Sequence, residues 1–343
     1  MTTPISFGLI GAGGIAQSYL QVFPRLDIAR IAAVADVRSE AAASAAEAVG
    51  CPAFDSWERM GEEVALDAVL ICSPPATHTE IALHFLHQGV AVLCEKPLSI
   101  DVDSAVELAR AAEANGTLLT MASKFRYVQD VIRARSILDS GILGDIILFE
   151  NVFASRAEMA DRWNSDPSVS GGGVLIDNGT HSVDIIRYFL GPIAEVLTVE
   201  GKRVQSLAVE DTAQLFVRTA GGVRGTVDLS WSLDKERDSF IEIYGSQGTV
   251  RVGWRESKYR QASSPDWVVF GSGYDKISAM GAQVVNFCRA LRGEERLLIT
   301  AEDAIASVAV IDRAYRSLRT SQWTPVEDPT LADAELLRRE VAV

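Results

Sequence analysis

A histidine and two acidic residues near the middle of the chain are spaced for proton transfer. Asp177, His181 and Asp184 follow three consecutive glycines, and intervals of four and three residues place them on one face of a helix. A carboxylate one turn from an imidazole can orient the ring and shift its pKa, which suits general acid–base catalysis. A lone histidine is more often structural, but this setting favours catalysis. One histidine among carboxylates lacks the ligands that zinc prefers, so we expect no metal site.

A lysine follows an apolar run in the first third of the chain. Glu95-Lys96-Pro97 comes directly after an expected strand at Val90–Leu93. In parallel sheets ligands bind at the carboxyl ends of the strands, where the Lys96 ammonium could donate to a substrate hydroxyl or carbonyl. The proline fixes the turn and permits a cis bond. Taken alone, one exposed lysine would be a solvated charge.

The segment Gly11–Ala16 (GAGGIA) follows the first expected strand and opens a helix. Its glycines allow a tight turn and close approach of a pyrophosphate to the backbone, which the helix N-terminus then binds. Asp36 ends the second expected strand, 25 residues after Gly11 (36 − 11 = 25), and could accept hydrogen bonds from the adenosine ribose. This favours NAD, although Arg38 could bind the 2′-phosphate of NADP.

The loop after the fourth expected strand should border the nicotinamide half of the dinucleotide. It carries Ser73 and Pro74, and then Thr77, which forms a capping box with Glu80. His78 fits a contact with the cofactor or a structural place in the first helical turn about equally well.

The first third of the chain alternates apolar runs with helical patterns, which predicts a doubly wound parallel sheet. We expect strands at Ile5–Ile10, Ile31–Ala35, Ala68–Ile71, Val90–Leu93 and Leu118–Met121. We divide the chain into a dinucleotide-binding Rossmann domain (1–123), a second domain (124–325) and a tail (326–343).

The second domain has longer strands and few helices, which predicts a mostly antiparallel open sheet with helices on one face (α+β). Strands are expected at Ile146–Ala154, Glu195–Gly201, Thr212–Arg218, Val223–Ser232, Phe240–Tyr244 and Thr249–Val252. Helices are expected at Tyr127–Asp139, Ala279–Leu291 and Glu302–Leu318, besides the helix of His181.

Charge and cysteine usage narrow the class of protein. The charges sum to 32 − 46 = −14, which disfavours nucleic acid and anionic membrane as partners. Four cysteines without a Cys-x-x-Cys pair indicate reduced thiols in a cytosolic protein. The uncharged stretch from Met1 to Pro24 has no Lys or Arg before its apolar run and is interrupted by glycines, so we expect neither a signal peptide nor a membrane span.

Together these motifs resemble the family of glucose-fructose oxidoreductase and inositol dehydrogenase over residues 5 to 325. The matching elements are Gly11–Ala16, Ser73-Pro74-Pro75 with His78, Glu95-Lys96-Pro97, Gly171–Asp184, Val209–Ala213, and Tyr244-Gly245 with Gly248-Thr249. The resemblance implies that Lys96, Asp177 and His181 are catalytic. It also places Trp163 near the nicotinamide, with Asn164 where many members have arginine.

The resemblance implies an NAD(P)-dependent oxidoreductase acting on a sugar, a polyol or a sugar derivative. Expected contacts to the cofactor are Gly11, Ala12, Gly13, Gly14, Ile15, Asp36, Arg38, Ser73, Pro74, His78, Glu95, Lys96 and Trp163. Expected contacts to the substrate are Arg126, Arg156, Asp177 and His181. Alternatives are a non-catalytic dinucleotide-binding regulator, an NAD-recycling glycosidase and a dihydrodiol dehydrogenase. An exposed sheet face in the second domain would need covering, so we expect a homodimer or homotetramer.

Overall fold

The computed structural model describes residues 3–327, which form two compact units. The first unit contains residues 3–124 and Lys276–Ile305, and the second contains Phe125–Asp275 and residues 306–327. The division after residue 124 lies one residue from the expected boundary. Residues 276–305 differ from the expected division, because Met280, Val284 and Phe287 belong to the apolar core of the first unit. Of the expected tail, residues 328–343 lie outside the described residues.

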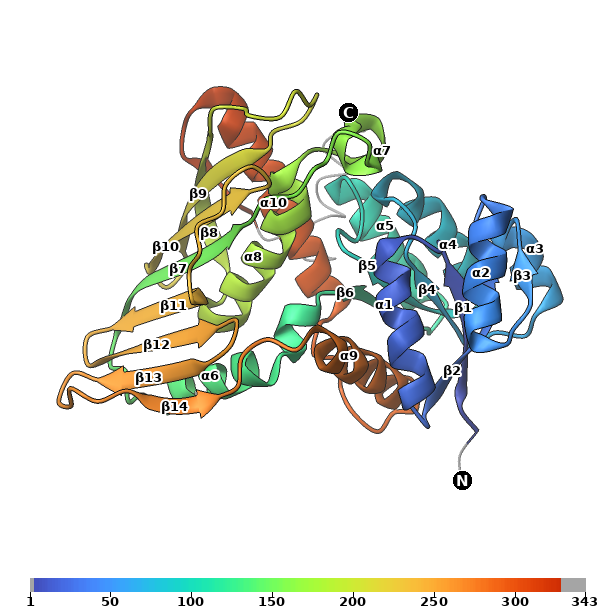
Figure 1. Ribbon diagram of the computed structural model, residues 1–343, viewed down its shortest axis with the longest axis horizontal. Helices are drawn as coiled ribbons and strands as arrows, with labels where there is room; N and C mark the ends of the chain where they lie inside the picture. The colour runs from blue at the N-terminus through green and yellow to red at the C-terminus, as the bar shows by residue number, and fades with distance from the viewer. Residues whose placement is uncertain (1–2, 328–343) are drawn as a thin grey trace. The chain divides into compact units, whose positions relative to one another are not determined.

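Among the described residues, the first unit holds a six-stranded parallel sheet in the order β3-β2-β1-β4-β5-β6 (Figure 1). The expected doubly wound sheet is thus confirmed. Its strands are β1 (Ile5–Ile10), β2 (Ala29–Ala35), β3 (Ala53–Phe54), β4 (Ala68–Ile71), β5 (Ala91–Glu95) and β6 (Leu119–Ala122). Its helices are α1 (Gly14–Val22), α2 (Ser39–Val49), α3 (Trp57–Glu63), α4 (His78–His87), α5 (Val102–Ala114) and α9 (Lys276–Leu291).

The strands of this sheet are covered on both faces, as their continuous apolar runs predict. Every residue of β4 and β5 is buried, and α9 packs against α1 through a core that also contains Phe7 and Tyr19. The chain reverses its order of winding between β1 and β4. Ligands bind at such a switch point, outside the carboxyl ends of the strands. The loops after β1, β4 and β5 are therefore the ones that can form a site.

The second unit contains, in the part of the chain that the structure describes, a nine-stranded sheet in the order β14-β13-β12-β11-β7-β10-β9-β8-β15. Its strands are β7 (Ile146–Ala154), β8 (Ile193–Glu200), β9 (Thr212–Thr219), β10 (Arg224–Ser230), β11 (Ser239–Gly245), β12 (Gly248–Gly253), β13 (Ser257–Gln261), β14 (Val268–Gly271) and β15 (Thr324–Pro325). Only β7 and β10 pair in parallel within this range, so the sheet is mostly antiparallel, as expected.

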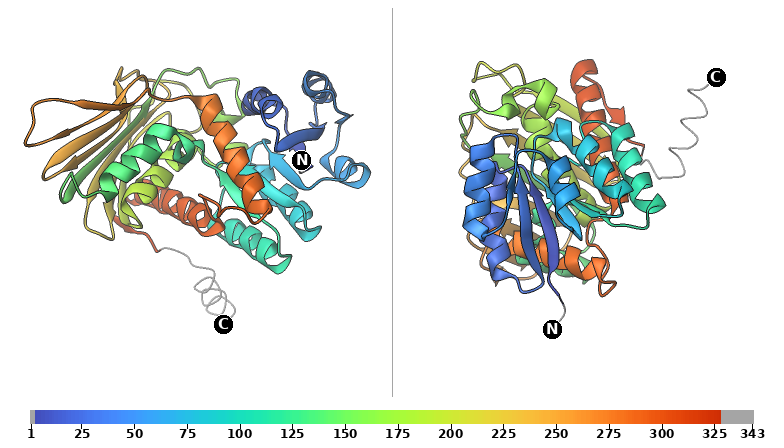
Figure 2. Two further views of the ribbon diagram at one scale, coloured as in Figure 1. Left: turned by 90° about the horizontal axis from the view of Figure 1, so that it is seen from below. Right: turned by 90° about the vertical axis from the view of Figure 1, so that its right-hand side faces the viewer.

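Helices line one face of this sheet, in agreement with the sequence pattern. The helices in contact with its strands include α6 (Gln129–Asp139) and α8 (Val174–Leu190). The short α7 (Pro167–Ser170) precedes α8, and α10 (Ala301–Thr320) lies near the end of the described chain. Figure 2 shows α6 and α8 along the same side of the strands, and α8 contacts β7, β9 and β10. Along β9, Ala213, Leu215 and Val217 are buried while Gln214 and Arg218 are exposed. This alternation is the pattern of a sheet covered on one face only.

Candidate active site

The glycine turn after β1 has the conformation that a dinucleotide site needs. Gly11 has φ +88°, and a Cβ there would lie 2.6 Å from the backbone nitrogen of Ser73. Only glycine therefore fits where this turn contacts the end of β4. No side chain caps the N-terminus of α1, and a Cβ at Gly13 or Gly14 would meet open space. The free N–H groups at this helix end can bind a pyrophosphate.

Asp36 follows β2 and is held beside the glycine turn. Its carboxylate accepts hydrogen bonds from the backbone N–H groups of Ala12 (2.7 Å) and Arg38 (2.8 Å), and from the Arg38 guanidinium (3.2 and 3.3 Å). Burial raises the pKa of Asp36, but the hydrogen bonds from Arg38 and Ala12 outweigh it, so the pKa lies below its usual value. The carboxylate is thus charged and oriented, as recognition of a ribose requires.

Exchanging Asp36 for asparagine should weaken NAD and strengthen NADP. The change removes the negative charge that repels a 2′-phosphate and frees the Arg38 guanidinium to bind it. Losing one charged hydrogen bond to the ribose should raise the Kd of NAD by about 10-fold. Titration of both dinucleotides against protein fluorescence measures this. Arg38→Ala is the control, since it should weaken NADP without strengthening NAD, and an unchanged ratio in Asp36→Asn would refute the assignment.

The loop after β4 differs from the expectation in two side chains. Thr77 makes no capping hydrogen bond to α4; its hydroxyl contacts the Ser73 hydroxyl and donates to the Pro74 carbonyl, both at 2.8 Å. The capping box was therefore wrong, because Thr77 already belongs to a 3-10 turn. His78 is only 1% exposed, and its ring nitrogens lie 2.8 Å from the Pro97 carbonyl oxygen and 2.9 Å from that of Ser73. The ring faces protein carbonyls, which favours the structural role over the cofactor contact. Burial lowers its pKa.

Lys96 stands at the carboxyl end of β5 and is half-buried, and its bond to Pro97 is cis. Glu95, expected to touch the cofactor, instead points into the protein. Its carboxylate accepts from the Tyr19 hydroxyl (3.0 Å) and from the Lys96 backbone N–H (3.2 Å). Tyr19 in turn accepts from the Gln283 side chain at 2.9 Å. No sequence motif points to Tyr19, because its position in α1 is that of an ordinary core residue.

Helix α8 in the second unit carries the expected acid and imidazole. Asp177 is half-buried and His181 is 5% exposed, on one face of the helix. The His181 ring meets Phe125 edge-on at 5.0 Å and Phe153 at 6.4 Å between ring centroids. This packing restricts the rotamer of His181, as a group that transfers a proton at a fixed place requires.

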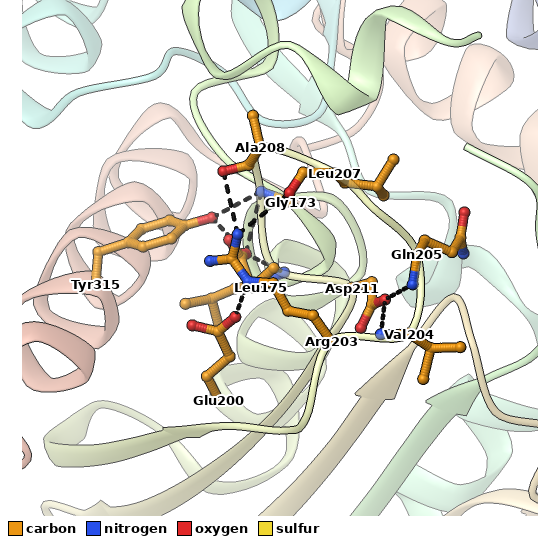
Figure 3. A network of polar contacts seen from close by, with 11 residues as sticks. Gly173, Leu175, Glu200, Arg203, Val204, Gln205, Leu207, Ala208, Asp211 and Tyr315 are labelled. Atoms are coloured by element: carbon orange, nitrogen blue, oxygen red, sulfur yellow. Dashed lines mark hydrogen bonds and ion pairs between the residues drawn. The ribbon is translucent and has the colours of Figure 1, made fainter. Parts of the chain in front are cut away.

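The N-terminus of α8 is held by a buried carboxylate, and sequence reasoning assigned no role to it. Glu210 Oε1 accepts from the backbone N–H groups of Gly173 (3.1 Å) and Leu175 (3.0 Å) and from the Tyr315 hydroxyl (2.8 Å). Figure 3 shows Gly173, Leu175 and Tyr315 from close by. A Cβ at Gly173 would lie 2.0 Å from the Glu210 carbonyl oxygen, so this close approach requires glycine. Glu210 is 4% exposed, and burial raises its pKa despite these hydrogen bonds.

Glu210→Gln should become more stable relative to the parent protein as the pH rises. Because burial raises the pKa of Glu210 in the folded state, the stability that its protonated form contributes is present below the usual glutamate pKa. That contribution is lost as the pH rises through the raised pKa. The amide cannot titrate and loses nothing. Urea unfolding of both proteins at a series of pH values measures the difference, and a difference independent of pH would contradict the expectation.

Arg126, expected to contact the substrate, is instead part of a buried ion pair. Its guanidinium binds the Asp184 carboxylate at 2.7 and 3.0 Å, and the two side chains are 4% and 0% exposed. The guanidinium also lies 5.5 Å from the centroid of the Tyr188 ring. The structure thus accounts for Arg126 by its ion pair with Asp184, a partner that the helical spacing of Asp184 did not indicate.

The remaining expected residues lie in the segment between β7 and α7. Arg156 is exposed, and Trp163 is 45% exposed in a 3-10 turn at Trp163–Ser165. Neither is held by a contact that assigns it a ligand, so their roles stay predictions. Within residues 3–327, no three His, Cys, Asp or Glu side chains gather where they could hold a metal ion. Over the same range, no helix has the length and apolar character needed to cross a membrane.

Comparison with known proteins agrees with this picture. Residues 5–123 match the model of an oxidoreductase family with an NAD-binding Rossmann fold, and residues 131–251 match that of the GFO/IDH/MocA C-terminal domain. Inositol 2-dehydrogenase of Rhizobium meliloti (strain 1021) is 25% identical over 92% of this chain and 97% of its own. The rhizopine catabolism protein MocA of Rhizobium meliloti is 27% identical over 92% and 96%.

Solved structures show the same fold. A levoglucosan dehydrogenase in complex with NADH superposes with a TM-score of 0.87 at 20% identity, covering 94% of this chain and 99% of that one. The two family models together span well over half of the residues. The chain therefore belongs to the GFO/IDH/MocA family of oxidoreductases, with an NAD-binding Rossmann fold in its first unit.

Proposed function

We propose that this protein is an NAD-dependent dehydrogenase that interconverts a carbinol and a ketone carbon of a sugar, a polyol or a sugar derivative. Membership of the family supports the reaction type, and relatives named for inositol, D-apiose and levoglucosan support the substrate class. The observation that carries the proposal is the pair Asp177 and His181, fixed on one face of α8 by the Glu210 contacts at its N-terminus.

The residues of the first unit fit a dinucleotide. The uncapped N-terminus of α1 can receive the pyrophosphate, and the oriented Asp36 carboxylate can receive the ribose hydroxyls. Bound NAD supplies the acceptor for the hydride that leaves the carbinol carbon. The open space beside Gly13 and Gly14 leaves room for the phosphates.

We assign proton transfer and charge stabilisation to three side chains of the protein. During oxidation we assign to His181 the removal of the hydroxyl proton, and during reduction its return. Asp177 would hold the substrate hydroxyl and orient the imidazole. Lys96 would stabilise the negative charge that develops on the substrate oxygen by a charged hydrogen bond. The balance is one hydride to the cofactor, one proton to His181 and a new C=O bond.

A panel of inositols, aldoses and anhydrosugars incubated with NAD tests the proposal. We expect one or more of them to generate NADH, measured by its near-ultraviolet absorbance. Hydrolysis of a glycoside without net NADH would identify a glycosidase that recycles NAD instead. Oxidation of an aromatic dihydrodiol, with no oxidation of any sugar or polyol, would identify a dihydrodiol dehydrogenase. Tight dinucleotide binding with no turnover of any compound would identify a regulator.

We also propose that the protein is a homodimer or homotetramer that uses the sheet face opposite α8. That face carries half-exposed apolar side chains among charged ones, as on β8, where Val199 is 48% exposed. Burying such a face would protect the sheet. Mass measurement in solution tests this, and a monomer at micromolar concentration would refute it.

We further propose a reducing compartment, the cytoplasm. The four cysteines are free, and burial raises the pKa of the Cys72 and Cys94 thiols well above its usual value. Such thiols act as small apolar residues and are kept reduced in the cytosol. Fractionation of the source cells tests the location.

A further inference from the structure

The turn that carries Lys96 is tied to the nucleotide-binding helix by a buried chain of hydrogen bonds. Gln283 Nε2 donates to the Tyr19 hydroxyl (2.9 Å), and that hydroxyl donates to Glu95 Oε1 (3.0 Å). The other carboxylate oxygen of Glu95 accepts the backbone N–H of Lys96 at 3.2 Å. Gln283, Tyr19 and Glu95 are 1%, 0% and 8% exposed. The chain thus runs from α9 through α1 to the end of β5, entirely within the first unit.

The direction of each hydrogen bond in this chain is determined. A carboxylate can only accept, so the Tyr19 proton must point to Glu95 and the amide of Gln283 must donate to the phenol oxygen. Burial, and next the Glu95 carboxylate, raises the pKa of Tyr19 well above its usual value, so the hydroxyl keeps its proton. Both hydrogen bonds of the Tyr19 hydroxyl are thereby assigned, and they restrain the phenol between α9 and the end of β5.

The position of Tyr19 links this series of hydrogen bonds to the two expected binding sites of the first unit. Tyr19 lies on α1, whose N-terminus is the expected pyrophosphate site, and Lys96 is the expected donor to the substrate oxygen. Fixing the Lys96 backbone against α1 sets the ammonium relative to the cofactor. A displacement of about 1 Å at such a group can cost up to 100-fold in rate.

We propose that Tyr19 is a positioning residue for Lys96, acting through the carboxylate of Glu95. This inference rests on the proposed function of Lys96. Tyr19 is 0% exposed, so its side chain acts through its protein partners and not by contact with a bound molecule. Phenylalanine removes the hydroxyl, and with it the hydrogen bond to Glu95, while keeping the ring.

The test compares Tyr19→Phe with Thr120→Val in the full chain. Thr120 is 1% exposed and its hydroxyl donates to the Ile299 carbonyl at 2.7 Å, so its loss is a matched loss of one buried hydroxyl hydrogen bond. Both variants should lower Tm by similar amounts. Only Tyr19→Phe should lower kcat, by about 10-fold, with the Kd of NAD unchanged. A kcat that falls equally in both variants, or in neither, overturns the proposal.

A double-mutant cycle separates positioning from general loosening. If Tyr19 acts through Glu95, Tyr19→Phe should have no further effect on kcat in the Glu95→Ala background, where neither the Tyr19 hydroxyl nor the Lys96 N–H has a carboxylate to donate to. A full additional loss in that background means that Tyr19 acts by another route, and it overturns the proposal.

One readout does not need turnover. The chain has six lysines, Lys96, Lys124, Lys202, Lys235, Lys258 and Lys276, so NMR of lysine-labelled protein can resolve Lys96, with Lys96→Met as the assignment control. Its Cε–Hε cross-peak should move in Tyr19→Phe and stay in Thr120→Val. If the parent protein turns over no sugar or polyol, the proposed function fails while this measurement still decides the positioning. An unmoved cross-peak overturns the inference.

Discussion

Replacing His181 by alanine is expected to lower kcat by about 100-fold or more, while the affinity for NAD stays unchanged. The imidazole is the group on α8 to which we assign the proton transfer, and the expected dinucleotide contacts of Gly11–Ala16 and Asp36 belong to the other unit. Turnover of the panel substrate and titration of NAD measure the two quantities. The pH–rate profile of the variant should also lack the limb that reports a general base in the profile of the parent enzyme.

Two controls make this result interpretable. His181 packs against Phe125 and Phe153, so alanine leaves a cavity, and His181→Gln fills most of that volume without providing a base. Both variants should be equally inactive. His87→Ala removes an exposed histidine of α4 and should keep full turnover. If His181→Gln keeps the activity of the parent enzyme, the proton is transferred by another group.

The parallel sheet could be predicted from the sequence because burial on both faces leaves a continuous apolar run. β1 and β4 match the expected strands residue for residue. Strands without such a run were missed. β3 and β15 have two residues each, and β13 is largely polar at the edge region of its sheet. Their pairing depends on neighbours that are distant in the chain, which no local pattern reports.

Within each unit, the place of a candidate site residue along its helix or strand could be predicted from the sequence, but not the direction in which its side chain points. The i, i+4 spacing placed Asp177 and His181 on one helix face, as the structure has them. Glu95 was placed correctly at the end of β5 and His78 in the first turn of its helix, yet the Glu95 carboxylate turns inward to Tyr19 and the His78 ring to the Pro97 carbonyl. The direction of a side chain at a strand end is decided by tertiary contacts, and Tyr19 was invisible for the same reason.

Breaking the buried ion pair between Arg126 and Asp184 is the change for which we expect the largest loss of stability. Exchange of Arg126 for methionine should lower the unfolding free energy by roughly 3–5 kcal/mol, because Asp184, at 0% exposure, would keep a buried charge without its partner. Asp184→Asn should also be costly, because the Arg126 guanidinium, at 4% exposure, would keep its buried charge opposite a neutral amide. Urea denaturation followed by circular dichroism measures both changes.

The double variant Arg126→Met/Asp184→Leu distinguishes a stabilising pair from a costly one. Removing both charges takes away their desolvation as well as their attraction, so the double variant should be more stable than Arg126→Met alone. Arg59→Met is the matched control, because Arg59 pairs with Asp55 and Glu63 on the surface and its loss should leave the unfolding midpoint unchanged. A double variant as unstable as the sum of the single ones would mean that the two groups act independently. Arg126 would then stabilise the second unit mainly through its contact with the Tyr188 ring.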